Sequence, residues 1–137
     1  MSVQLESGGE VRSSVDVLVV DDDDAVRSTC AAILRSSGYS VAVASDGDVA
    51  LRFLEEQAAD LILLDLRMPR RDGLSVLQSL TAPQLVVLVS AYSIDDALQA
   101  RADAKVVTYL EKPVQPERLL ETVATTLSRA RIDADGT

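Results

Sequence analysis

Histidine and tryptophan are absent from this chain of 137 residues, and phenylalanine and cysteine occur once each. Without histidine the chain cannot build a histidine-based catalytic triad, a His-ligated zinc site or a phosphohistidine of its own. The single cysteine, Cys30, cannot close an intrachain disulfide. With aromatic residues at 3%, aliphatic side chains must pack the core. Any chemistry therefore has to use carboxylates, hydroxyls and lysines.

Basic residues are also scarce, because 13 Lys and Arg face 22 Asp and Glu, which gives a net charge of −9. That charge repels phosphate backbones and anionic membranes. No apolar run approaches the roughly 18 residues of a membrane span. The opening MSVQLESGGE has neither the basic nor the apolar region of a secretory signal. We expect a cytoplasmic protein that binds neither nucleic acid nor membrane directly.

The length fits a single domain of about 100 to 150 residues. The polar residues 1–14 are expected to form a flexible leader and residues 132–137 a flexible tail, with one domain over 15–131. Inside that domain, short aliphatic runs alternate with segments of helical period, which predicts βα units around a parallel sheet covered on both faces. The runs are Val15–Val20, Val41–Ala44, Leu61–Leu64, Leu85–Val89 and Val106–Leu110.

Five apolar stripes at helical spacing separate and follow these strands. Core packing is the interpretation we give all of them, so no chemistry is assigned to these side chains. Gly38 stands where a left-handed helix cap is expected, and Pro116 stands in the first turn of the last helix. The stripes are Val26, Cys30, Ile33 and Leu34; Ala50, Phe53 and Leu54; Leu74 and Leu77; Ile94, Ala97 and Leu98; and Leu119, Leu120, Val123 and Leu127.

Four consecutive aspartates, Asp21 to Asp24, follow the first strand. Two like charges about 4 Å apart repel by about 4 kcal/mol at an effective dielectric of 20, so a folded site that crowds these carboxylates should bind a cation. Hard oxygen ligands favour magnesium or calcium. We expect Asp24 to cap the first helix and Asp21 and Asp22 to serve the site.

Three further polar residues end later strands: Asp65 after LILL, Ser90 after LVVLV, and Lys112 next to Pro113. Asp22 and Asp65 are 43 residues apart, Asp65 and Ser90 are 25 apart, and Ser90 and Lys112 are 22 apart, so each interval holds whole βα units. Because the carboxyl ends of parallel strands meet at one edge of a sheet, a single pocket can hold all of these side chains. Gly73 should permit a close backbone approach nearby.

Four segments of the sequence, VLVVDDDDAVR, LILLDLRMPRRDGL, VLVSAYS and TYLEKPV, strongly resemble the receiver domain of two-component response regulators. The resemblance covers roughly residues 15 to 131. It implies a doubly wound, flavodoxin-like (βα)5 fold, a three-layer sandwich around a parallel five-stranded sheet of order 2-1-3-4-5. It also implies a signalling phosphoprotein rather than an enzyme, with intrinsic self-phosphorylation and self-dephosphorylation.

The resemblance implies that Asp65 is the phosphoacceptor. A carboxylate can attack a phosphoryl group without first losing a proton at neutral pH, which agrees with that role. Mg²⁺, with Mn²⁺ as a substitute, would be held by Asp22, Asp65, the backbone carbonyl of Arg67 and, largely through water, Asp21. Aligning Asp24 with a position where the family often has proline gives the acid pair Asp21 and Asp22, and a one-residue slip to Asp22 and Asp23 stays open.

The remaining roles follow from the same resemblance. Lys112 would contact a phosphoryl oxygen, Ser90 would donate a hydrogen bond to the attached phosphoryl group, and Tyr109 would rotate inward in response. This movement would alter the surface formed by the helix near Ile94–Leu98, the strand Val106–Leu110 and the last helix, where an effector or a second copy would dock. The phosphodonor would be a sensor histidine kinase or a histidine phosphotransfer protein.

Three departures from the family pattern occur in this sequence. Lys105 and Val106 stand where Gly-Ala is common, Val114 replaces a frequent phenylalanine, and Ser90 replaces a commoner threonine. Two other functions fit part of this pattern. A haloacid-dehalogenase phosphatase would need a further acidic pair after its lysine, and the sequence offers none outside the last helix and tail. A receiver that binds partners without phosphorylation is the second alternative.

Overall fold

The computed structural model describes residues 14–66, 68, 73–80, 84–90 and 106–134 of the chain. The expected helix near Ile94–Leu98, the backbone carbonyl of Arg67 and the side chain of Lys105 lie outside these residues. The strands are β1 (Ser14–Val20), β2 (Val41–Ala44), β3 (Ala58–Asp65), β4 (Leu85–Ser90) and β5 (Val106–Glu111). The helices are α1 (Asp24–Ser36), α2 (Gly47–Glu56), α3 (Gly73–Ser79) and α5 (Pro116–Ala134).

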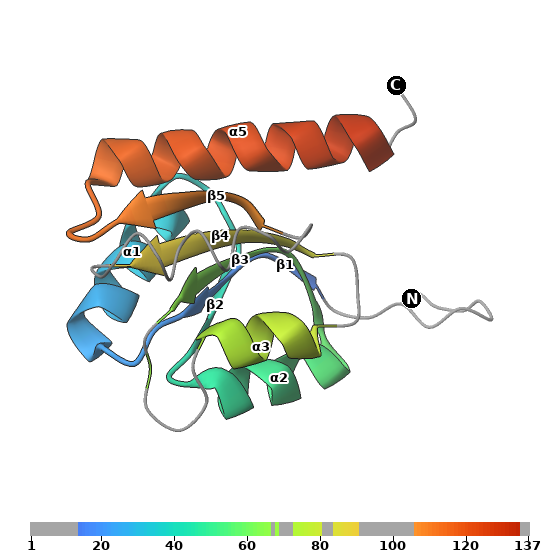
Figure 1. Ribbon diagram of the computed structural model, residues 1–137. Helices are drawn as coiled ribbons and strands as arrows, with labels where there is room; N and C mark the ends of the chain where they lie inside the picture. Colours follow the sequence, from blue (N-terminus) through green and yellow to red (C-terminus); the bar gives the residue numbers. More distant parts are fainter. Residues whose placement is uncertain (1–13, 67, 69–72, 81–83, 91–105, 135–137) are drawn as a thin grey trace, which may run out of the picture.

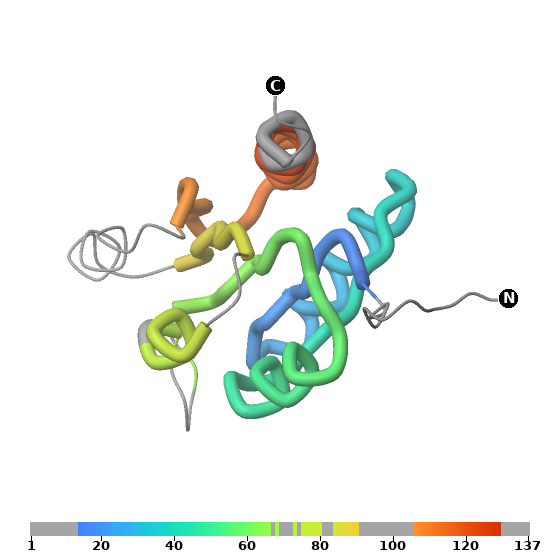
Figure 2. Tube along the Cα trace, turned by 90° about the vertical axis from the view of Figure 1, so that its right-hand side faces the viewer, coloured from blue at the N-terminus to red at the C-terminus, as the bar shows by residue number. Residues whose placement is uncertain are grey.

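The five strands form one parallel sheet of order β2-β1-β3-β4-β5, which confirms the predicted topology. Figure 1 shows α5 running along one side of the sheet, with α2 and α3 on the other. The view along α5 in Figure 2 separates these layers. Since β1 and β3 lie at the centre, aliphatic residues cover both of their faces, as expected for a parallel sheet between helices.

Two apolar clusters, one on each side of the sheet, hold the layers together. The cluster beneath α1 and α5 includes Cys30, Leu34 and Leu119, and the cluster beneath α2 and α3 includes Ala50 and Leu77. The predicted stripes are therefore core, wherever the structure describes their side chains. Burial, followed by the nearby charge of Asp21, raises the pKa of the Cys30 thiol, so this side chain stays a neutral packing group.

The residue that caps the N-terminus of α1 lies one position earlier than we predicted. Asp23, not Asp24, is its N-cap, because the Asp23 carboxylate accepts hydrogen bonds from the backbone N–H groups of Ala25 and Val26 at 2.9 and 3.1 Å. Asp24 has helical geometry and is the first residue of the helix. The sequence could not separate the two, because either aspartate offers the same capping oxygen.

Helix α1 ends as the sequence predicts. Gly38 has φ of 96°, its N–H donates to the carbonyl of Arg35, and the N–H of Tyr39 donates to the carbonyl of Leu34. This paired arrangement satisfies the last carbonyls of the helix. A side chain at Gly38 would meet no atom within 4 Å, so the positive φ alone explains the glycine.

Strand β3 begins three residues before the predicted run. Ser14 pairs with Ala58 and Val15 with Ala59, so the additional residues extend the central pairing with β1. The hydrophobic pattern missed them because the exposed carboxylate of Asp60 interrupts it. At the other end of the chain, α5 continues to Ala134, beyond residue 131, where we placed the end of the domain. Within the described residues, no helix has both the length and the apolar character needed to cross a membrane.

Candidate functional site

The predicted polar residues do meet at the carboxyl edge of the sheet. Asp21 directly follows β1, Asp65 ends β3, Ser90 ends β4 and Lys112 follows β5. Asp65 is in register with Val89, and the backbone N–H of Lys112 donates to the carbonyl of Ser90 at 3.0 Å. Parallel pairing in register therefore brings residues that are distant in sequence to neighbouring positions along one edge.

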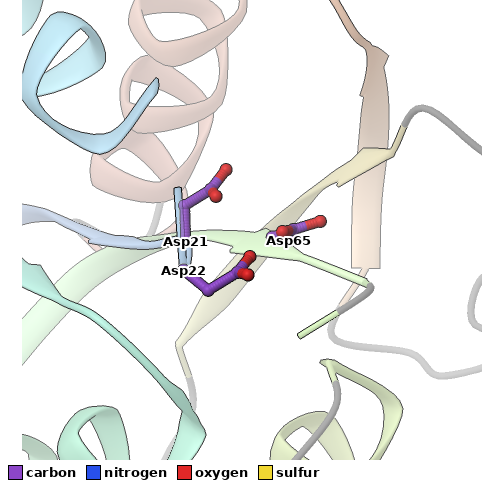
Figure 3. Close-up of side chains that lie close together, drawn as sticks. All are labelled: Asp21, Asp22 and Asp65. Carbon is purple, nitrogen blue, oxygen red and sulfur yellow. The ribbon is translucent and has the colours of Figure 1, made fainter. Parts of the chain in front are cut away.

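Three carboxylates cluster where β1 and β3 end. One oxygen from each of Asp21, Asp22 and Asp65 lies within 4.8 Å of the other two, and Figure 3 shows the three side chains gathered there. Asp21 and Asp65 are each 3% exposed, whereas Asp22 is exposed. Asp23 is absent from this cluster among the described residues, because its carboxylate caps α1. The geometry thus favours Asp21 and Asp22 over the alternative pair.

Lys112 brings a positive charge to the carboxylate cluster. Its Nζ lies 3.0 Å from Oδ2 of Asp21 and 3.4 Å from Oδ2 of Asp65, so its side chain reaches back from the end of β5 to β1 and β3. Partial burial lowers the pKa of this ammonium, but hydrogen bonding to Asp21 and the charges of both carboxylates outweigh the burial and raise the pKa overall. The lysine is therefore held in its charged form between two buried acids.

The four consecutive aspartates have four different environments. Asp21 is buried, and its Oδ1 accepts a hydrogen bond of 2.9 Å from the backbone N–H of Asp23. Asp22 is exposed within the carboxylate cluster, and Asp23 caps the helix. Asp24 forms an ion pair with Arg27. The acidic run is thus a set of distinct contacts and not a general negative surface.

Gly73 begins α3 directly against the end of β3. A Cβ at this position would lie 2.4 Å from the backbone oxygen of Asp65 and 2.7 Å from the Cα of Leu66. The N–H of Gly73 also donates to the carbonyl of Leu66 at 3.0 Å. No other residue allows this approach without moving the backbone of Asp65, which confirms the predicted role of the glycine.

The two predicted switch residues lie on the neighbouring strands. Ser90 is 2% exposed at the end of β4, the strand paired with β3. Tyr109 is half-buried in β5, opposite Leu88, and packs against the apolar cluster on the α2 and α3 side. The structure therefore places a buried hydroxyl beside the acid-bearing strand and an aromatic ring one strand farther along.

Sequence reasoning assigned no role to Arg27, although it lies in the first motif. Its Nη1 donates to the backbone carbonyl of Asp21 at 2.8 Å, and its Nη2 contacts Oδ1 of Asp24. The spacing of three residues between Asp24 and Arg27 predicts an ion pair on a helix. The contact with Asp21 depends on the turn between β1 and α1, which spacing alone does not reveal.

Residues 17–124 match the response regulator receiver domain family. The chain belongs to that family. A receiver domain is a signalling domain of two-component systems, and this assignment decides against the haloacid-dehalogenase alternative.

Similar proteins agree with this assignment. The chain is 36% identical over 124 residues to the transcriptional regulatory protein ZraR of Salmonella typhimurium, covering 88% of this chain and 28% of that protein. It is 37% identical over 126 residues to the response regulator MprA of Mycobacterium ulcerans, covering 89% and 54%. A CheY-like receiver domain protein of Methanospirillum hungatei has 27% identity and a TM-score of 0.79 over 90% of this chain and 99% of its own.

The chain thus spans little more than a quarter of ZraR and about half of MprA. The similarity covers the receiver part of these longer regulators.

Proposed function

We propose that this receiver domain accepts a phosphoryl group on Asp65 and thereby changes the surface it offers to a partner. The observation that carries the proposal is the contact of Lys112 with Asp65 in a carboxylate cluster that also contains Asp21 and Asp22. A buried carboxylate beside an ammonium group and two more acids combines a nucleophile with charges that can bind a phosphoryl group and its metal ion.

The proposed transfer needs no general base. An oxygen of the ionised Asp65 carboxylate forms a bond to phosphorus, and the bond from phosphorus to the donor's nitrogen or oxygen breaks, with its electron pair leaving on the donor. Lys112 contacts the phosphoryl oxygens and compensates their charge. Its partial burial makes that compensation stronger than it would be in open water.

The donor set fits a divalent cation. Among the described residues, three carboxylates gather around the ammonium of Lys112, and carboxylate oxygens are the ligands that Mg²⁺ prefers. Asp22 and Asp65, with Asp21 partly through water and the carbonyl of Arg67, would hold Mg²⁺, and Mn²⁺ would substitute. When bound, the cation would neutralise charge on the transferring phosphoryl group.

The proposed output uses Ser90 and Tyr109. The Ser90 hydroxyl would donate to the attached phosphoryl group, and Tyr109 would repack against the α2 and α3 cluster. The surface of β5, α5 and the segment before β5 would then bind an effector or a second copy of the chain. We propose a sensor histidine kinase or a histidine phosphotransfer protein as donor, in the cytoplasm.

Mass spectrometry after incubation with acetyl phosphate and Mg²⁺ tests the proposal. We expect one added phosphoryl group in the native protein and none in Asp65→Asn. Asp60→Asn is the matched control, because Asp60 is an exposed aspartate on the same strand, and we expect it to label normally.

Undiminished labelling of Asp65→Asn would show that another residue is the acceptor. Labelling that persists in a chelator would remove the metal from the mechanism. A native protein that stays unlabelled by both acetyl phosphate and phosphoramidate would favour the receiver that works without phosphorylation.

A further inference from the structure

The turn between β1 and α1 is three residues long and carries two acids of the carboxylate cluster. Strand pairing holds its first residue, since the N–H of Asp21 donates to the carbonyl of Ala44 at 3.2 Å. The cap made by Asp23 holds its last residue. Asp22 lies between them, exposed, so its side chain direction depends on the orientation of the peptide that joins it to Asp21.

Arg27 fixes that peptide. Its Nη1 donates to the carbonyl oxygen of Asp21 at 2.8 Å, which is the oxygen of the peptide between Asp21 and Asp22. The guanidinium is rigid, its side chain is 15% exposed, and its Nη2 contacts Asp24 on the same helix. The N–H of Arg27 also donates to the carbonyl of Asp23 at 2.9 Å, which places the residue in the first regular turn of α1.

We propose that Arg27 is a positioning residue for divalent-cation binding, which holds the Asp21–Asp22 peptide so that the Asp22 carboxylate stays in the cluster with Asp21 and Asp65. This inference rests on the proposed function, because it assumes that the carboxylate cluster binds Mg²⁺. Arg27 acts through the backbone and lies outside the set of metal ligands. Groups that orient the ligands of a metal typically change its affinity about 10- to 100-fold when removed.

The charge of Arg27 and its contact with the peptide predict opposite changes in Mg²⁺ affinity when Arg27 is substituted. A positive charge near the carboxylate cluster repels a cation, so removal of the charge alone would tighten Mg²⁺ binding. Loss of the peptide orientation would weaken it. The direction of the change in affinity therefore distinguishes positioning from a simple electrostatic contribution, and a role limited to the stability of α1 would leave the affinity of the folded protein unchanged.

Titration calorimetry with Mg²⁺ on the folded full chain, with Mn²⁺ paramagnetic resonance as a second readout, tests the inference. We expect Arg27→Lys, which keeps the charge but loses the planar fork, to raise the Mg²⁺ dissociation constant about tenfold. Arg27→Gln should also raise it, but by a smaller factor, because the loss of the repelling positive charge partly offsets the loss of the peptide orientation. Arg35→Lys is the matched control, because Arg35 lies on the same helix and donates to the carbonyl of Val41 at 2.9 Å, away from the pocket; its affinity should equal that of the native protein.

If the Mg²⁺ dissociation constant is unchanged or lower in both Arg27 variants, the inference is overturned, while the proposed function stays intact. A native protein without measurable Mg²⁺ or Mn²⁺ binding would instead overturn the metal role on which the inference rests. Circular dichroism of each variant at the titration temperature establishes that the comparison is between folded proteins.

Discussion

Residues of one chemical type have different structural roles in this protein, and the four consecutive aspartates are the clearest case. Asp21 is buried against Lys112, Asp22 is an exposed member of the carboxylate cluster, and Asp23 caps α1. Substitutions to asparagine can separate these contributions, since asparagine removes the charge yet caps a helix about as well as aspartate.

We predict that Mg²⁺ stabilises the native protein and Asp23→Asn but not Asp22→Asn. A ligand bound only by the folded state adds about 1.4 kcal/mol at ten times its dissociation constant. Asp22→Asn loses a ligand, and without metal it should be slightly more stable than the native protein, because one repelling carboxylate is gone. Thermal unfolding with and without Mg²⁺ measures both effects.

The Asp23→Asn variant is the control for charge, because it removes a neighbouring carboxylate and keeps the cap. If Asp23→Asn also loses the Mg²⁺ increment, Asp23 belongs to the acid pair and our assignment of Asp21 and Asp22 is wrong.

At the scale of elements, helix α1 positions much of the site, because its N-terminus follows the acids and its first turn carries Arg27. Both ends of this helix are fixed by local interactions, the Asp23 cap at the start and the Gly38 turn at the end. Helix α3 is positioned differently, by the close contact of Gly73 with the backbone of Asp65. Each helix that follows an acid-bearing strand is thus tied to that strand end.

We predict that Asp23→Ala lowers the free energy of unfolding by about 1 kcal/mol, since two backbone N–H groups of α1 lose their acceptor. Urea unfolding measures the loss. Asp24→Ala should cost less, because Asp24 only pairs with Arg27 and its side chain is 87% exposed. A larger loss for Asp24→Ala than for Asp23→Ala would contradict the assignment of the cap.

The sequence predicted most elements because their patterns are local. Runs such as Leu85–Val89 are apolar throughout, and a covered parallel strand requires that. The start of β3 at Ala58 was missed because the exposed Asp60 breaks the pattern in a strand that is elsewhere buried. The pocket residues were predictable because strand ends meet at one edge. The N-cap and the contact of Arg27 with Asp21 were not, since both depend on the backbone path of a three-residue turn.

For the molecule as a whole, the sheet separates two apolar cores and β5 contributes to both. Tyr109 packs against the α2 and α3 side and Leu110 against the α1 and α5 side. A displacement of β5 toward the pocket would therefore disturb both layers. Close-packed interiors switch between discrete arrangements more readily than they deform. A displacement of β5 at the carboxyl edge of the sheet would therefore be transmitted to the helices on both faces.

We predict that phosphorylation changes partner affinity or self-association about 5- to 150-fold, the usual range of coupling between two sites. Ser90→Ala should still accept phosphate on Asp65 but lose most of this change, because the sensing hydroxyl is gone. Ser90→Thr, which keeps the hydroxyl, is the matched control. Sedimentation and hydrogen exchange, with beryllium fluoride as the phosphoryl mimic, measure the response.

We expect beryllium fluoride to change the exchange protection of residues 106–127 in the native protein. The same residues should show no change in Ser90→Ala. Changes confined to α1 and α2 would contradict the proposed route.

The ion pairs of Lys112 can form only late in biosynthesis. Its partners end the first and third strands, whereas the lysine follows the last strand. Because translation proceeds from the amino terminus, every acid of the pocket leaves the ribosome before the ammonium that compensates it. A chain released after β4 would contain Asp65 and its crowded neighbours without Lys112. The Lys112 ion pairs can thus form only after nearly the entire domain has emerged, so a chain that ends before Lys112 lacks them.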